Sequence, residues 1–265
     1  MAIERKGEIG YRFYVYLQYR DEPAAFTLVE LLALIAIVGV LAGLLLATVV
    51  RSRGAAQRIQ CASNVRQLGL ALQEFVADNH VYPLFVNVDF RNGGYREHDG
   101  NWIDALEHEK VASQPGKSFF ETGVWRCPSA RRPSAFPTNA AYLSYGYNAY
   151  GLDVIGIPVS LGLGGHKVGI SARTFAPPVS ESEVASPSDM MAIGEVFNGG
   201  AVFWRDRKAA STKNALLRHQ GMANAVFCDG HIETPTLEAL FAGTNNAALV
   251  RWNRDHQPHR EKLAP

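Results

Sequence analysis

The chain has few cysteines and no excess of charge of either sign. Its 265 residues include only Cys61, Cys127 and Cys228, and 26 basic side chains face 25 acidic ones, for a formal net charge of +1. Three widely spaced cysteines argue against a disulfide-rich scaffold and against a cysteine-rich zinc site. The balanced charge argues against a nucleic-acid partner and against an acidic disordered chain. One disulfide with one spare thiol fits a domain outside the cytoplasm, but the sequence does not choose the pair.

Sequence motifs of known catalytic chemistry are also missing. The chain has no H-E-x-x-H, no C-x-x-C and no G-x-S-x-G, which are the local signatures of zinc hydrolases, paired-thiol sites and serine hydrolases. We therefore predict no catalytic residue, no cofactor and no enzymatic activity. One alternative stays open, a membrane-tethered metal-dependent hydrolase with His219, Asp229 and His231 as ligands, but we favour Asp229-Gly230 as a hairpin turn.

One segment departs from the ordinary composition of the chain. From Leu31 to Val50 there is no charged residue, and Thr48 is the only polar side chain. Twenty such residues in a helix span about 30 Å, the thickness of the bilayer core. A buried core helix is usually shorter and amphipathic, and the apolar core of a cleaved secretory signal is about 7–15 residues long. The segment therefore predicts a transmembrane helix over residues 26–50.

The start of this segment carries a specific motif. Phe26-Thr-Leu-Val-Glu30 and the apolar run after it resemble the cleavage and methylation motif of type IV pilins and type II secretion pseudopilins. The resemblance implies a cut by prepilin peptidase between Ala25 and Phe26, and methylation of the new amine. It also implies that Glu30 pairs with the N-terminal amine of a neighbouring subunit. The alternative is that Glu30 simply lies at the membrane interface, where the positive end of the helix favours it.

The leader and the flanking charges depart from the pattern of that family. Alanine stands at position 25, where the family usually has glycine, and residues 1–25 carry four basic and four acidic side chains. Four arginines between residues 51 and 66 follow the span, whereas two closely precede it. By the positive-inside rule this bias keeps the C-terminal side in the cytoplasm. We follow the motif, which places that side in the periplasm or at the cell surface, because long domains translocate largely regardless of charge.

Beyond the span the pattern predicts an amphipathic continuation of the helix and then a small sheet. Apolar residues recur at three- and four-residue steps from Val65 to Val76, and Asn79-His80 ends the pattern. Short apolar runs predict strands at 124–128, 142–148 and 190–194, and a hairpin at 225–234. The expected fold is α+β, a long N-terminal helix packed on a small antiparallel sheet. The expected division is leader 1–25, transmembrane helix 26–50, helix continuation 51–80, head domain 81–244 and polar surface tail 245–265.

The C-terminal half adds a second resemblance. His219, nine further residues and Asp229-Gly230 form an H-x9-D-G element, which is similar to that of pilin-like proteins abundant in planctomycetes, verrucomicrobia and their relatives. The segments 58–70, 126–129 and 144–148 are similar to further parts of that family. The resemblance implies a structural subunit of a filament, anchored in the inner membrane. Its partners would be prepilin peptidase, other pilin or pseudopilin subunits and membrane lipid, and not nucleic acid. A non-polymerising anchored binding domain is a further alternative.

Overall fold

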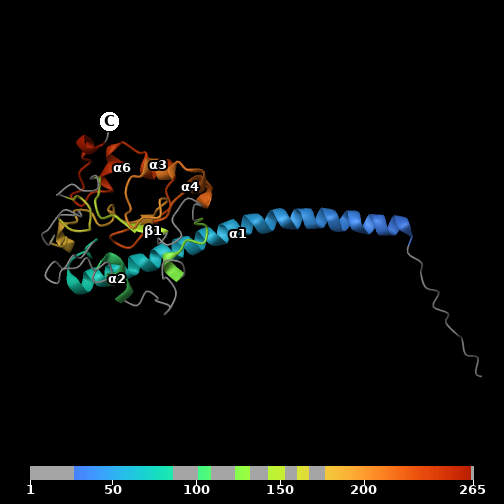
Figure 1. Ribbon diagram of the computed structural model, residues 1–265, viewed down its shortest axis with the longest axis horizontal. Helices are drawn as coiled ribbons and strands as arrows, with labels where there is room; N and C mark the ends of the chain where they lie inside the picture. Colours follow the sequence, from blue (N-terminus) through green and yellow to red (C-terminus); the bar gives the residue numbers. More distant parts are fainter. Residues whose placement is uncertain are drawn as a thin grey trace, which may run out of the picture. The chain divides into compact units, whose positions relative to one another are not determined.

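A computed structural model describes residues 27–85, 101–108, 123–131, 143–152, 160–166 and 177–263. The chain divides into two compact units, Met1–Val49 and Val50–Pro265. The elements, in chain order, are α1 (Leu28–Asn79), α2 (Trp102–His108), η3 (Gly123–Trp125), β1 (Tyr145–Tyr147), η4 (Glu181–Glu183), β2 (Met191–Glu195), α3 (Arg207–Ala210), α4 (Lys213–Leu217), η5 (Arg218–Gln220), β3 (Ala225–Phe227), β4 (Ile232–Glu233), α5 (Leu237–Phe241), α6 (Asn246–Val250) and η6 (Arg260–Lys262). Figure 1 shows their arrangement.

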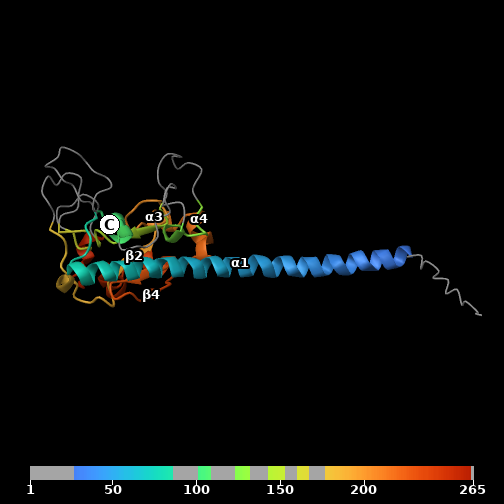
Figure 2. The same cartoon turned by 90° about the horizontal axis from the view of Figure 1, so that it is seen from below.

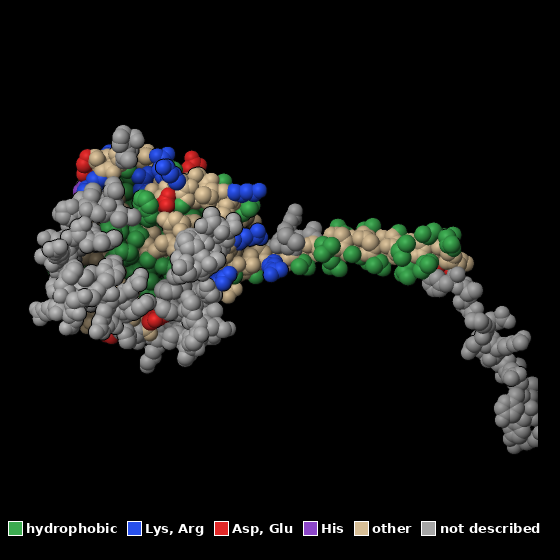
Figure 3. Space-filling model, in the orientation of Figure 1, with side chains coloured by type: hydrophobic (Ala, Val, Ile, Leu, Met, Phe, Trp, Pro, Cys, Tyr) green, Lys and Arg blue, Asp and Glu red, His purple; other side chains and the backbone are tan. Residues whose placement is uncertain are grey.

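The predicted long helix is confirmed, because α1 is one helix of 52 residues. In the first unit its large apolar side chains are exposed, and Figure 3 shows them along the visible face of the helix. Leu28–Leu46 is long and apolar enough to cross a membrane, and it is the one such helix in the part of the chain that the structure describes. The helix ends at Asn79, where His80 takes a left-handed φ of 57° and donates its N–H to the Val76 carbonyl.

The second half of α1 forms one side of the core of the second unit. Val65, Leu68 and Leu72 are fully or almost fully buried, as their spacing predicts. Between them Gly69 lies against β3: a Cβ at this position would come within 3.3 Å of both Cβ and Cγ1 of Val226, and closer still to Cγ2. Glycine therefore allows the helix to approach the sheet closely. Figure 2 shows the C-terminal half of α1 beside the strands from a second direction.

The sheet has four antiparallel strands in the order β1-β2-β3-β4. The predicted strands at 142–148 and 190–194 and the hairpin at 225–234 are confirmed. The strand predicted at 124–128 is wrong: residues 123–125 form the short helix η3, and Cys127 is held there by a side-chain bond rather than by strand pairing.

Alternate residues of β3 divide the interior into two clusters. Val226 belongs to the cluster that includes α1, whereas Ala225 and Phe227 belong to a cluster built with the short helices α3 to α6. In Figure 1 the strands accordingly lie between α1 and the helices α3, α4 and α6.

The C-terminal segment is part of this second cluster, and the predicted polar surface tail at 245–265 is wrong over residues 245–263. Leu249 and Trp252 are fully buried, and the Trp252 ring lies 4.9 Å from that of Phe203. Asn253 is also buried and accepts the backbone N–H of Leu152. Two large apolar side chains, three residues apart, are enough to anchor the segment.

Candidate functional site

The predicted assembly residue Glu30 lies in the first turn of α1, while Ala25 and Phe26 lie outside the described residues. Its carboxylate accepts the backbone N–H of Thr27 at 2.9 Å and the Thr27 hydroxyl at 2.8 Å. In return the Thr27 hydroxyl oxygen accepts the Glu30 N–H at 3.2 Å. This reciprocal pair is a capping box, which satisfies backbone donors that a helix start leaves open.

A second group of polar residues lies buried where α1 meets the head. Cys61 on α1 and Cys127 after η3 form a disulfide, with Cα atoms 5.1 Å apart and both side chains fully buried. The bond closes a loop of 66 residues and ties the long helix to the head. Cys228 remains a buried thiol, and burial raises its pKa to about 12, so it stays protonated at neutral pH.

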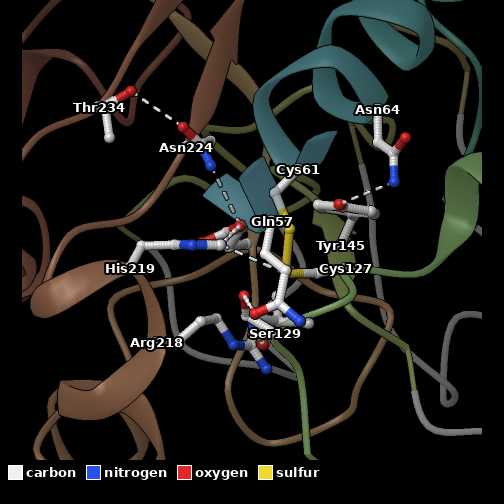
Figure 4. Close-up of polar contacts among 12 residues, drawn as sticks. Gln57, Cys61, Asn64, Cys127, Ser129, Tyr145, Arg218, His219, Asn224 and Thr234 are labelled. Carbon is white, nitrogen blue, oxygen red and sulfur yellow. Dashed lines mark hydrogen bonds and ion pairs between the residues drawn. A yellow bond between two sulfur atoms is a disulfide. The ribbon is translucent and has the colours of Figure 1, made fainter. Parts of the chain in front are cut away.

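His219, the first residue of the H-x9-D-G element, lies against this disulfide. Its Nε2 is 3.3 Å from the Cys127 sulfur and 2.9 Å from Oε1 of Glu195, and its side chain is 1% exposed. Figure 4 shows the ring beside the sulfur–sulfur bond. The backbone at His219 is left-handed, with φ 49° and ψ 31°. Such a conformation is costly for a residue with a side chain and is typical of functional sites.

Glu195 at the end of β2 is the buried acidic residue of this group. Its side chain has no exposed surface, and Oε1 also accepts the Asn224 amide at 3.2 Å. The Asn224 amide oxygen in turn accepts the Thr234 hydroxyl at 2.9 Å. Glu195 Oε2 and His219 Nδ1 have no hydrogen-bond partner among the residues that the structure describes. A buried carboxylate with one free oxygen is costly unless charge nearby compensates it.

Arg218 supplies a buried positive charge next to His219. Its side chain donates to the Val196 carbonyl at 3.0 Å and lies 4.6 Å from the centre of the Phe197 ring. The opposed charges are both felt at Tyr145: burial raises the pKa of its hydroxyl, Glu195 raises it further, and Arg218 acts against the rise.

Four potential metal ligands converge in this group. One sulfur each from Cys61 and Cys127, a carboxylate oxygen of Glu195 and a ring nitrogen of His219 all lie within 4.8 Å of one another, and all four residues are buried. We call these four residues the Cys-Glu-His cluster. Thiolate, imidazole and carboxylate are the ligand types that bind Zn²⁺ in proteins.

The rest of the H-x9-D-G element has a structural role in the turn between β3 and β4. Gly230 has φ 87°, and a Cβ there would lie 2.8 Å from Nε2 of Gln73 on α1. Asp229 accepts the backbone N–H of His231 and pairs with its Nδ1 at 2.6 Å, and both side chains are more than a third exposed. The predicted hairpin turn is confirmed. The alternative ligand set of His219, Asp229 and His231 does not assemble, since His219 lies in the buried cluster instead.

Sequence reasoning missed Glu195, Asn224 and Arg218. The available signal for Glu195 was a carboxylate placed directly after the apolar run 190–194, at the end of a buried strand. Arg218 and Asn224 had no local signal. Three segments noted for their family resemblance do converge here, because Cys61, Cys127 and His219 come from residues 58–70, 126–129 and the H-x9-D-G element.

A groove runs along one edge of the cluster. It is lined by α1, the segment after η3 and the α4–η5 region, and it includes Arg218 and His219. Arg53, Arg58 and Arg131 also line it, and no acidic residue is among its described lining residues. The groove therefore reaches the buried histidine from a basic surface.

No protein-family model, no curated protein and no solved structure matches this chain.

Proposed function

We propose that this chain is a pilin-like or pseudopilin-like structural subunit of a type IV pilus-like or type II secretion-like filament. It would be anchored in the inner membrane by one helix, with its α+β head in the periplasm or at the cell surface. The observation that carries the proposal is the composition of α1. Leu28–Leu46 is apolar and exposed on all sides, yet it holds one carboxylate, Glu30.

An apolar helix of this kind requires lipid or other subunits around it. Left in water, each large apolar side chain would forgo about 1.5–3 kcal/mol of burial. The other half of α1 behaves differently, because Val65, Leu68 and Leu72 are already covered by the chain's own head. The helix is thus suited to two environments, an apolar one for its first half and its own folded head for the second.

Glu30 has a use in such an assembly beyond its capping box. A carboxylate in an apolar segment costs a few kcal/mol unless it finds a partner, and the ammonium group of a processed neighbouring subunit would be one. The capping box does not compete with processing, because a cut before Phe26 leaves the Thr27 amide N–H intact. The carboxylate can therefore hold its own helix start and still accept an ammonium on its remaining lone pairs.

The first test is mass spectrometry of the N-terminal peptide from native membranes. We expect a mature chain that begins at Phe26 with a methylated amine. An unprocessed N-terminus, in cells that contain prepilin peptidase, would refute the processing step and leave only a membrane-anchored domain.

The second test separates the two roles of Glu30. Two differently tagged copies of the chain are co-expressed, and co-purification from membranes reports assembly. Glutamine at N3 still serves a capping box but carries no charge, so Glu30→Gln is expected to lose assembly as fully as Glu30→Ala. Thr27→Ala, the matched control, removes the cap at a cost of about 0.5–2 kcal/mol and is expected to retain assembly.

The contrary pattern would assign Glu30 to capping alone. In that case Glu30→Gln would assemble like the wild type, while Glu30→Ala and Thr27→Ala would be impaired together. Wild-type copies that never co-purify would favour the non-polymerising anchored domain.

A further inference from the structure

We propose that the Cys-Glu-His cluster is a Zn²⁺ site when the Cys61–Cys127 disulfide is reduced. The ligands would be the two cysteine sulfurs, Nε2 of His219 and Oε1 of Glu195. The proposal concerns the junction between α1 and the head, and it does not depend on whether the chain assembles into a filament.

The positions of the four ligand atoms suit one tetrahedral ion. With metal–ligand bonds of about 2.0–2.3 Å, neighbouring ligand atoms of a tetrahedral Zn²⁺ lie about 3.3–3.8 Å apart. His219 Nε2 is already 3.3 Å from the Cys127 sulfur and 2.9 Å from the Glu195 oxygen, and the whole set lies within 4.8 Å. Reduction frees the two sulfurs to move apart, and small shifts of the side chains would bring the remaining distances into this range.

The charges also favour a divalent cation. Two thiolates and the Glu195 carboxylate carry three negative charges, Zn²⁺ supplies two positive ones, and the buried guanidinium of Arg218 supplies the third. Without an ion the reduced cluster would keep a buried carboxylate and two buried thiols around one imidazole, with few partners to satisfy them.

A disulfide alone does not explain the neighbours that this one has. A buried disulfide is uncharged and requires no ionisable group beside it, whereas Glu195 and His219 are both buried against it. The left-handed backbone at His219 aims the ring at this point at a cost in conformational energy. A metal ion bound at this point would take both the imidazole and the carboxylate as ligands.

The two states exclude each other. A dithiol reductant transfers two electrons and two protons to the disulfide, giving two cysteine thiols, and is itself oxidised to a disulfide. Zn²⁺ then displaces both thiol protons to water as it binds the sulfurs. Reoxidation by an external disulfide, which accepts the two electrons and is itself reduced to two thiols, joins the sulfurs again and releases the ion. Either state ties α1 to the head, once through the disulfide and once through the metal.

The test uses the full chain, purified in detergent and reduced with a phosphine that is removed before metal is added. Co²⁺ serves as the spectroscopic probe for the Zn²⁺ site. We expect the reduced protein to bind one equivalent of Co²⁺, with the intense visible bands of tetrahedral Co²⁺ and a near-ultraviolet thiolate band. We expect Zn²⁺ to displace it and the oxidised protein to show neither band.

Variants identify the ligands. His219→Ala and Glu195→Gln should each weaken Co²⁺ binding by more than the about 10- to 100-fold that loss of an outer-sphere partner costs. Cys228→Ser, the matched control, removes the remaining cysteine, which is not a member of the cluster, and should leave the spectrum unchanged. Circular dichroism of each reduced variant shows whether its head is folded.

Three results would overturn the proposal. The first is a reduced wild-type chain that takes up no stoichiometric Co²⁺. The second is a spectrum that depends on Cys228, and the third is unchanged affinity in both His219→Ala and Glu195→Gln, which would mean adventitious thiolate chelation. The wild-type titration decides the matter even if a variant fails to fold. Loss of filament assembly would leave all of these readouts untouched.

Discussion

Replacement of Gly69 by alanine is expected to destabilise the head, although alanine is the better helix former. In an open helix position this substitution stabilises by about 1 kcal/mol. At position 69 the new Cβ would come within 3.3 Å of two carbons of Val226 and closer to a third, well inside the about 3.5–4.0 Å of a favourable contact. Val226 is fully buried in β3 and β-branched, so it has little freedom to move away.

The net effect follows from these two opposing contributions. Overpacking a core costs about 1–3 kcal/mol, so after the gain in helix propensity we expect a net loss of up to about 2 kcal/mol. For a domain of this size that corresponds to a melting temperature lower by up to about 8 °C. Tryptophan fluorescence during thermal unfolding reports on the head, since Trp102, Trp125 and Trp252 are buried there.

Two further variants test the reasoning. Gly54→Ala is the matched control on the same helix, where a Cβ would meet nothing within 4 Å, and it should be neutral or slightly stabilising. Val226→Ala should destabilise on its own by leaving a cavity, and the Gly69→Ala and Val226→Ala pair should lose about 1–3 kcal/mol less than the sum of the singles. If Gly69→Ala stabilises as much as Gly54→Ala does, the close approach of helix and sheet is wrong.

Two other measurements probe the Cys61–Cys127 disulfide and the C-terminal segment. In metal-free buffer, the double variant Cys61→Ser, Cys127→Ser should lower the unfolding free energy by about 4 kcal/mol, because the disulfide removes the chain entropy of a 66-residue loop. An unchanged denaturation curve would show that this disulfide does not stabilise the fold. Burial lowers the pKa of His259, but its hydrogen bonds with Asp255 and Glu261 outweigh this and raise the pKa above its ordinary 6.5. The stability that protonated His259 contributes is therefore fully present below pH 6.5 and is lost as pH rises through the folded-state pKa. His259→Gln should flatten that part of a melting-temperature profile, and an identical profile would contradict it.

The parts of the fold that could be predicted from the sequence are those with a local pattern. Residues 28–50 form one long apolar run and residues 65–76 repeat apolar side chains at helical steps, and Asp229-Gly230 is a strong turn signal between two short apolar runs. Residues 124–128 resemble the short apolar runs that form strands, but the disulfide of Cys127 and the glycine before Val124 favour η3 there. Leu249 and Trp252 gave no periodic signal, because two anchors in a polar stretch form no pattern.

The cluster could not be predicted because its members are brought together only by tertiary structure. Cys61 and Cys127 are 66 residues apart, His219 lies 92 residues beyond Cys127, and Glu195 precedes His219 by 24. No spacing rule for metal or disulfide sites applies over such distances. The family resemblance included the segments that hold Cys61, Cys127 and His219, but it did not predict that these residues lie close together.

The structure leaves the first half of α1 exposed and packs its second half against the head. Several contacts hold that second half in place. In the filament proposed above, the head would have to stay attached to the helix when the helix is pulled. Between residues 61 and 73 the helix contributes a disulfide, the close approach at Gly69 and the Gln73 contact beneath Gly230. The disulfide is the strongest of these and is the one that a reducing environment removes. A metal bound by the same two sulfurs would hold that junction before oxidation, when the Cys61–Cys127 bond does not yet join the side of the helix to the head.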